Sequence, residues 1–195
     1  MARRSYRMDK RASAAAETRQ RIVEACFGLH VEQGIAQTTM AQIAARAGVG
    51  AGTVYHHFAD YDSMVAACTA HAATLLPLPG PDVLVGREGL GDRLQALAAT
   101  IFGFYGQARG LALVRADRAG FAPIEAFFTA EEGNRLALAQ AALAPLGYDE
   151  HAARIAAAML DLAVHDNLVG AGLSTPAAAE AVAAVLAAGL PAARP

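Results

Sequence analysis

The sequence predicts an all-α protein in which a small N-terminal head precedes a larger helical body. Apolar residues recur at intervals of three and four along most of the 195 residues, and no segment alternates as a strand would. Residues 77–91, PLPGPDVLVGREGLG, hold three prolines and four glycines and cannot sustain a long helix. We therefore predict an N-terminal arm at 1–13, a head at 14–76 and a body at 77–195.

Composition and charge limit the classes of protein to which this chain can belong. Hydrophobic residues make up 55% of the chain and charged residues 17%, so we expect a folded core and more apolar surface than one copy can cover. Residues 1–60 carry a net charge of +3 and the remainder carries −5, which fits a protein that contacts phosphate at one end. No apolar run reaches the roughly 20 residues of a membrane helix, and no signal peptide is evident. We expect a cytoplasmic protein without a membrane partner.

The head begins with a basic segment, residues 1–12, which we expect to be disordered when free. It is either a phosphate or minor-groove contact or a solvated tail. The first helix is predicted over 14–33, with Gly34 as its C-cap. Gly28 interrupts this helix at a cost of about 1 kcal/mol relative to Ala. His30 is expected to be a core histidine with a satisfied hydrogen bond; the alternative is a pH or metal sensor.

The head is organised around residues 39–58, TMAQIAARAGVGAGTVYHHF, which predict two short helices joined by a tight turn. Thr39 and Gln42 have the spacing of a capping box. Gly48 can adopt the left-handed conformation that ends a helix. Val54 would face inward on the second helix. Such a pair lays its second helix in the DNA major groove, although an ordinary helical hairpin has the same pattern.

With its flanks, this segment resembles the N-terminal domain of the tetracycline-repressor (TetR) family of bacterial regulators. The matching pieces follow one another without gaps between Thr18 and Met64: TRxRI, EQG, TTMxxIAxRAGV and GTVYHHF. The resemblance implies a homodimeric transcription regulator without enzymatic activity or cofactor. Such a protein would act as a repressor, released from a palindromic DNA operator by a small-molecule effector that is apolar or amphipathic.

The resemblance also implies which residues contact DNA. They lie at the start of the first short helix and on the outer face of the second: Thr39, Gly52, Thr53, Tyr55 and His56. Arg46 is a further candidate for a phosphate contact, or is simply solvated. The family often has Ser-Lys in place of Gly50–Ala51 and a lysine in place of Tyr61, so two common phosphate contacts are missing here.

The remaining helices follow from capping residues and apolar periodicity. Asp60 can cap a helix that runs to about Leu76. The body is predicted to contain five helices, at about 92–108, 111–119, 123–146 (with a possible break near Gly133), 150–171 and 175–189.

Aromatic residues concentrate in the first three body helices, where they form either a plain core or an effector pocket. In the family, this region encloses an apolar pocket. The candidate ligand-binding residues are Phe102, Tyr105, Arg115, Phe121, Phe128, Met159, His165 and Asn167.

The last two body helices are apolar around most of their circumference and must be covered on all sides. We expect them to form an intersubunit four-helix bundle. The residues predicted for this dimer interface are Leu162, Val169, Val182 and Leu186.

Catalytic and metal-binding patterns are not evident. Cys26 and Cys68 match no metal or redox spacing and are interpreted as small helix residues. Asp161 and His165, four residues apart, could supply half a metal site but are more typical of a hydrogen-bonded pair. The alternative to a regulator is a dimeric helical ligand-binding protein with weakened DNA binding; an enzyme is a more distant alternative. The effector and the operator sequence do not follow from the sequence.

Overall fold

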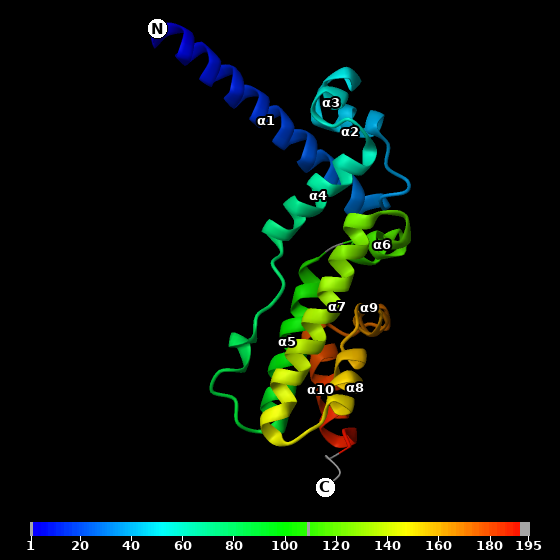
Figure 1. The fold of residues 1–195 in the computed structure, drawn as a ribbon. Coiled ribbons are helices and arrows are strands. Elements are labelled where there is room, and N and C mark those ends of the chain that lie inside the picture. The colour runs from blue at the N-terminus through cyan, green and yellow to red at the C-terminus, as the bar shows by residue number, and fades with distance from the viewer. Residues whose placement is uncertain (1, 109, 192–195) are drawn as a thin grey trace. The chain divides into compact units, whose positions relative to one another are not determined.

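The computed structural model describes residues 2–108 and 110–191, with side chains from residue 10 onward, and these ranges contain helices and turns but no strand. The predicted all-α class is confirmed. The chain divides into two compact units. We call residues 1–75 with 113–126 the head, and residues 76–112 with 127–195 the body (Figure 1). Among the described residues, none of the helices combines the length and the hydropathy that crossing a bilayer requires.

Four helices and the segment 113–126 make up the head. Its elements are α1 (Ala2–Gln33), α2 (Met40–Ala47), α3 (Ala51–His57), α4 (Tyr61–Leu75), most of α6 (Leu111–Ala116), the short 3-10 turn η2 (Arg118–Gly120) and the start of α7 (Ala122–Leu143). The body holds η1 (Pro81–Leu84), α5 (Leu90–Gln107), the rest of α7, η3 (Ala144–Leu146), α8 (Glu150–Met159), α9 (Leu162–Gly170) and α10 (Thr175–Gly189).

Helix α1 begins at Ala2, so the prediction of a disordered arm over residues 1–12 is wrong for the described part of that segment. The reason is local. Residues 2–27 contain no glycine or proline and are rich in Ala, Arg and other strong helix formers, so nothing stops the helix from extending. The helix ends as predicted, at Gly34, which has a φ of 85° and donates its N–H to the carbonyl of His30 at 2.9 Å.

The caps around the two short helices are confirmed. The Thr39 hydroxyl accepts a hydrogen bond from the Gln42 amide at 3.2 Å, and the Gln42 side chain accepts one from the Thr39 amide at 2.8 Å. Gly48 has a φ of 67° and ends α2. Helix α1 contacts α2, α3 and α4, and these four helices share one apolar core. Its largest members are Ile22, Val23, Leu29, Ile43, Val54, Phe58 and Met64.

The segment 113–126 was predicted to belong to the body, but it packs in the head. The Asp117 carboxylate accepts hydrogen bonds from the backbone amides of Ile35 at 2.7 Å and Ala36 at 2.9 Å. The Phe121 ring stacks edge-on against Tyr61, with the ring centroids 5.9 Å apart. A carboxylate 82 residues away thus completes the turn that follows α1, a pairing with no local sequence pattern.

The helix predicted over 150–171 is two helices, because the chain turns at Leu160 and Asp161. Asp161 caps α9 by accepting a hydrogen bond from the Ala163 amide at 2.9 Å, and its other oxygen accepts one from Arg135 at 2.8 Å. The possible break at Gly133 does not occur, and α7 is continuous there.

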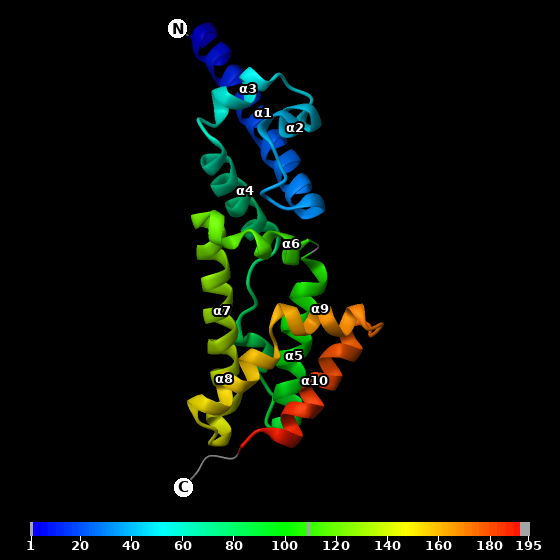
Figure 2. The same cartoon turned by 90° about the vertical axis from the view of Figure 1, so that its right-hand side faces the viewer.

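Helices α5 and α10 run side by side in the body (Figure 2). The contacting face of α10 is built largely from small residues, which let the two backbones approach closely; its buried residues are Ala178, Ala179, Val182, Ala183 and Leu186. Val182 and Leu186, predicted to meet a second copy, are therefore covered by this chain itself. Leu162 is also buried, whereas Val169 is exposed.

Candidate nucleic-acid interface

Helix α3 has one buried side and one exposed side. Val54 is completely buried in the head core, and Phe58 anchors the end of the helix. Tyr55 is 56% exposed, His56 is exposed, and Thr53 is half-buried in the first turn. The predicted DNA-contacting residues of α3 thus share the side that faces away from the core. A helix anchored by its inner face in this way can present its N-terminal turn to base edges.

Gly52 lies in the first turn of α3 and is exposed. A Cβ atom at this position would meet no described atom within 4 Å, so the chain's own packing does not require glycine here. The missing side chain instead lets an external surface approach the backbone closely.

Thr39 is exposed at the start of α2, as predicted, but its hydroxyl and amide are both engaged with Gln42 in the capping box. Its position at a helix N-terminus still suits a phosphate, because the first amides of a helix carry partial positive charge.

Arg46 is engaged with another side chain. Its guanidinium donates two hydrogen bonds to the Glu32 carboxylate, at 2.5 Å and 2.6 Å, and these bonds lower the pKa of Glu32. The arginine crosses α1 at Gly28, where an added Cβ would lie 2.9 Å from Arg46 Nη2. The glycine in the middle of α1 therefore makes room for this ion pair, a role that the sequence did not reveal.

Tyr61 occupies a position where the family usually has a lysine, and its side chain forms hydrogen bonds inside the head. Its hydroxyl donates to the Ile35 carbonyl at 2.8 Å and lies 2.9 Å from His30 Nε2. His30 is buried with hydrogen-bond partners, as expected for a core histidine.

Arg19 is a candidate that the sequence prediction missed. Its guanidinium carbon lies 4.8 Å from the centre of the Phe58 ring, so α1 places a positive charge beside the end of α3. The basic pair in the TRxRI stretch was the available indication of such a role.

Residues 22–68, which span the last third of α1 through the first half of α4, match the family model described as "Bacterial regulatory proteins, tetR family". The match identifies this segment, rather than the whole chain, as a TetR-type N-terminal domain. It is 51% identical over 49 residues to the HTH-type transcriptional regulator SrpR of Pseudomonas putida, a match that covers 25% of this chain and 23% of that protein. It is 42% identical over 53 residues to the HTH-type transcriptional repressor BepR of Brucella suis, covering 27% and 25% respectively. The chain thus spans about a quarter of the length of each of these relatives.

The fold of this chain also resembles solved structures over most of its length. The fatty acid degradation regulator FadR from Bacillus halodurans superposes with a TM-score of 0.64, at 19% identity, over 89% of this chain and 96% of that one. Identity this low establishes the fold alone. The sequence relatives are named as transcriptional regulators and repressors rather than enzymes, in agreement with the non-enzymatic prediction.

The structure separates the predicted effector-binding residues. Arg115 and Phe121 belong to the head unit. The rest belong to the body, where Phe102, Tyr105, Phe128 and His165 are buried, Met159 is half-buried and Asn167 is exposed. The eight residues therefore do not form one site within either unit.

The body contains a buried polar cluster that the sequence prediction mostly missed. The Tyr105 hydroxyl donates a hydrogen bond to Glu131, and Arg135 pairs with Asp161 at 2.8 Å and with Glu131 at 3.7 Å. Burial is the main cause that raises the pKa of Tyr105, so its hydroxyl keeps its proton. Among the described residues, the Arg135 Nε atom is buried without a hydrogen-bond partner. Glu131 and Arg135 lie four residues apart on α7, a spacing that could have indicated the pair.

His165 lies beside this cluster. Its ring is 5.2 Å from that of Phe102 and 5.8 Å from that of Tyr105, measured between centroids. Its nitrogens contact Asp166 at 2.8 Å and Thr175 at 3.3 Å. The predicted side-chain pair of Asp161 and His165 is not among these contacts, because Asp161 caps the helix in which His165 lies.

Proposed function

We propose that this protein is a homodimeric repressor that binds a palindromic operator through α3 and leaves it when a small effector binds the body. The observation that best supports DNA binding is the orientation of α3. Val54 is held in the core, while Gly52, Tyr55 and His56 are exposed on a helix of the TetR-type motif. The relative BepR is named a repressor, which favours that direction of regulation.

The side chains of α3 suit both parts of DNA recognition. The Thr53 hydroxyl can bond a base edge or its methyl group can contact a thymine methyl, and Tyr55 and His56 can reach phosphate or base edges. Arg19 at the end of α3 adds charge without sequence preference. Two recognition helices in a dimer would read half-sites roughly 34 Å apart.

The operator is testable with DNA taken from beside the coding sequence of this protein. We expect a labelled palindromic duplex from that region to bind, and its affinity to fall steeply with salt as phosphate contacts release counterions. A scrambled duplex of equal length is the matched control. Equal affinity for both duplexes at every salt concentration would contradict an operator-specific regulator.

The proposed effector is apolar or amphipathic, with a hydrogen-bond acceptor at one end. Support comes from the body, where the aromatic rings of Phe102 and Tyr105 lie beside a buried cluster that includes Arg135, whose Nε atom makes no hydrogen bond and faces Glu131 only at 3.7 Å. A structural relative is named a fatty acid degradation regulator, and a fatty acid has this amphipathic character. To oppose DNA binding, the effector must prefer the DNA-incompetent state, since equal affinity for both states shifts nothing.

The effector is testable by thermal shift with fatty acids and neutral apolar compounds, followed by release of operator DNA. We expect an acid to raise the unfolding temperature and to release the duplex, and Arg135→Lys to weaken both effects while preserving DNA binding. Release by neutral compounds in preference to acids would contradict an acceptor-bearing effector.

A dimeric ligand-binding protein with weakened DNA binding is the second candidate. The contacts of two residues favour this candidate. Arg46 is hydrogen-bonded to Glu32. Tyr61 replaces a common phosphate-contact lysine, and its hydroxyl donates to the Ile35 carbonyl inside the head. This candidate predicts that neither the operator nor random DNA binds at moderate salt, while the effector still binds the body.

A further inference from the structure

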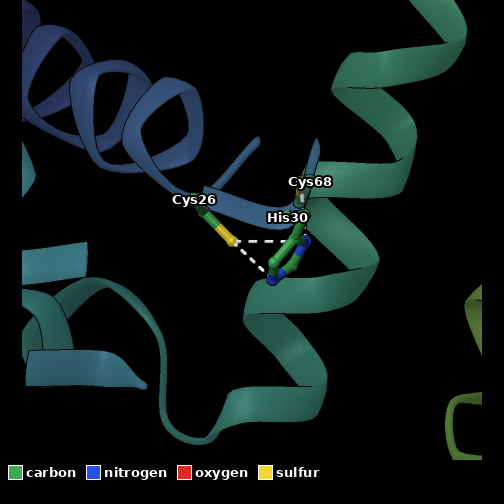
Figure 3. A group of neighbouring side chains, drawn as sticks. All are labelled: Cys26, His30 and Cys68. Atoms are coloured by element: carbon green, nitrogen blue, oxygen red, sulfur yellow. Dashed lines mark hydrogen bonds between the residues drawn. The ribbon is translucent and has the colours of Figure 1, made fainter. Parts of the chain in front are cut away.

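Three buried side chains with metal-binding atoms converge in the head, between α1 and α4. Cys26 and His30 lie four residues apart on α1, and Cys68 comes from α4 (Figure 3). One donor atom from each residue lies within 4.8 Å of the others, and the three residues are 0%, 3% and 4% exposed. The two cysteines were interpreted from the sequence as small helix residues; the fold instead brings them to the same histidine.

The hydrogen bonds around His30 fix which ring nitrogen is available. The Tyr61 hydroxyl has one proton and donates it to the Ile35 carbonyl at 2.8 Å. Its 2.9 Å contact with His30 Nε2 must therefore use a proton on that nitrogen. In the neutral ring, Nδ1 then carries a lone pair, and it lies 3.4 Å from Cys68 Sγ and 3.8 Å from Cys26 Sγ, which is 3.4 Å from Nε2.

This arrangement is the usual one for a metal-ligating histidine. Such a histidine donates its second ring N–H to an outer partner, which fixes the tautomer and orients the ring. Here the outer partner is Tyr61, itself held by the Ile35 carbonyl. The tyrosine that replaces a lysine of the family thus has a structural role in orienting His30 toward the two sulfur atoms.

The two distances from Nδ1 match the sulfur–nitrogen separation expected around a single metal ion. Metal–sulfur bonds of about 2.3 Å and metal–nitrogen bonds of about 2.0–2.1 Å at tetrahedral angles place sulfur and nitrogen about 3.6 Å apart. The two distances from Nδ1, 3.4 Å and 3.8 Å, lie on either side of this value. A small adjustment of side chains would therefore bring all three donors onto one ion.

We propose that Cys26, His30 and Cys68 bind one soft, closed-shell cation, Cu⁺ or Zn²⁺, and thereby join α1 to α4. Thiolate ligands select these ions over Mg²⁺ or Ca²⁺. Three protein donors suffice for Cu⁺, whereas Zn²⁺ would take a fourth, exogenous ligand.

The test uses the full-length protein, reduced and stripped of metal, in three titrations. Zn²⁺ and, without oxygen, Cu⁺ compete against chromophoric chelators, and Co²⁺ serves as a spectroscopic substitute for Zn²⁺. We expect one ion per chain for Cu⁺ or Zn²⁺; if Zn²⁺ binds, Co²⁺ should show thiolate-to-metal charge-transfer absorption. Cu⁺ binding without a Co²⁺ spectrum assigns the site to Cu⁺, and a Co²⁺ spectrum with Zn²⁺ competition assigns it to Zn²⁺.

Four variants separate this site from adventitious binding. Cys26→Ala and Cys68→Ala should each weaken binding about 100-fold or more, and Tyr61→Phe, which keeps all three donors, should weaken it roughly 10–100-fold. His151→Gln, which removes an exposed histidine of the body, should bind like the parent. Circular dichroism of the metal-free variants checks that the head remains folded.

The proposal is overturned if the reduced parent binds neither Cu⁺ nor Zn²⁺ more tightly than a folded Cys26→Ala/Cys68→Ala double variant. It is also overturned if the cysteine variants lose no affinity, or if His151→Gln loses as much as they do. If the alanine variants fail to fold, the affinity of Tyr61→Phe for the ion becomes the test. Unchanged affinity would then reject the proposal that Tyr61 orients His30 as a ligand.

Discussion

The head and the body differ in where their polar side chains lie. In the head, the predicted DNA-contacting groups come from a 20-residue stretch, and most of them are exposed on α2 and α3. In the body, the main polar cluster is buried and is assembled from α5, α7 and the turn before α9. A surface formed by residues that are close together in the sequence can be recognised from the sequence. A buried cluster assembled from distant helices cannot. The comparison teaches that a DNA-binding role is far easier to infer from this sequence than a ligand-binding one.

The largest expected effect on the free energy of unfolding comes from comparing a core position and a surface position on the same body helix. Val182 on α10 is 4% exposed and Val185 is 57% exposed. Val182→Glu should place an uncompensated charge in the core and lower the free energy of unfolding by about 3–5 kcal/mol. Val185→Glu should change it by within about 0.5 kcal/mol in the monomer. Urea unfolding measures both.

The same pair of variants sharpens the dimer proposal. If the exposed face of α10 meets a second copy, Val185→Glu should give a folded monomer in sedimentation velocity at a concentration where the parent is dimeric. A parent that is monomeric at micromolar concentration would remove the basis for the dimer. A dimeric Val185→Glu would move the interface to another face, such as that of Val169.

The next effect concerns the buried cluster of the body. Arg135→Met removes the guanidinium that pairs with Glu131 and Asp161, and should lower the free energy of unfolding by about 3 kcal/mol. Arg154→Met removes an exposed arginine that pairs with Glu150 on α8 and should cost less than about 1 kcal/mol. Similar losses for the two variants in urea unfolding would mean that the cluster is not stabilised as its burial indicates.

A smaller effect is expected where segment 113–126 meets the turn after α1. Asp117→Ala removes a charged acceptor for two backbone amides and should destabilise the head by about 1.5–3 kcal/mol. Asp117→Asn keeps one acceptor oxygen and should lose less. Hydrogen exchange at the amides of Ile35 and Ala36 reports the change directly; unaltered protection in Asp117→Ala would contradict the assigned contacts.

The smallest effect compares two mid-helix glycines. Gly133→Ala on α7 meets no described neighbour within 4 Å and should stabilise by about 1 kcal/mol through helix propensity. Gly28→Ala should gain less at neutral pH, because its methyl group displaces Arg46 from Glu32. The Arg46 hydrogen bond lowers the pKa of Glu32, so the pair stabilises above the ordinary value of 4.5 and is lost as the pH falls through the lowered value. The two variants should therefore converge in acid; a constant difference between their urea midpoints across that range would contradict the displacement.

Local patterns predicted local structure well. The capping box of Thr39 and Gln42, the left-handed Gly34 and Gly48, and the buried Val54 were all read from neighbouring residues and are confirmed. These features depend on hydrogen bonds and steric limits within one or two turns of helix, which the sequence specifies directly.

Long-range pairings account for most of the errors. The break at Asp161 depends on Arg135, 26 residues earlier, and the placement of segment 113–126 depends on Asp117 reaching Ile35. The cluster of Cys26, His30 and Cys68 has the same origin, because α4 returns along α1 only in the folded head. Spacing along the chain carries no information about such contacts.

The most direct test of the central claim, that exposed residues of α3 read DNA, is the operator affinity of Tyr55→Ala measured by fluorescence anisotropy. Tyr148→Ala, which removes a tyrosine of the body, is the matched control. We predict that Tyr55→Ala keeps the parent's unfolding midpoint and loses at least about tenfold in affinity, equivalent to about 1.4 kcal/mol, while Tyr148→Ala binds like the parent. Parental affinity in a folded Tyr55→Ala variant, together with parental affinity in Thr53→Ala, would contradict the assignment of α3 as the recognition helix.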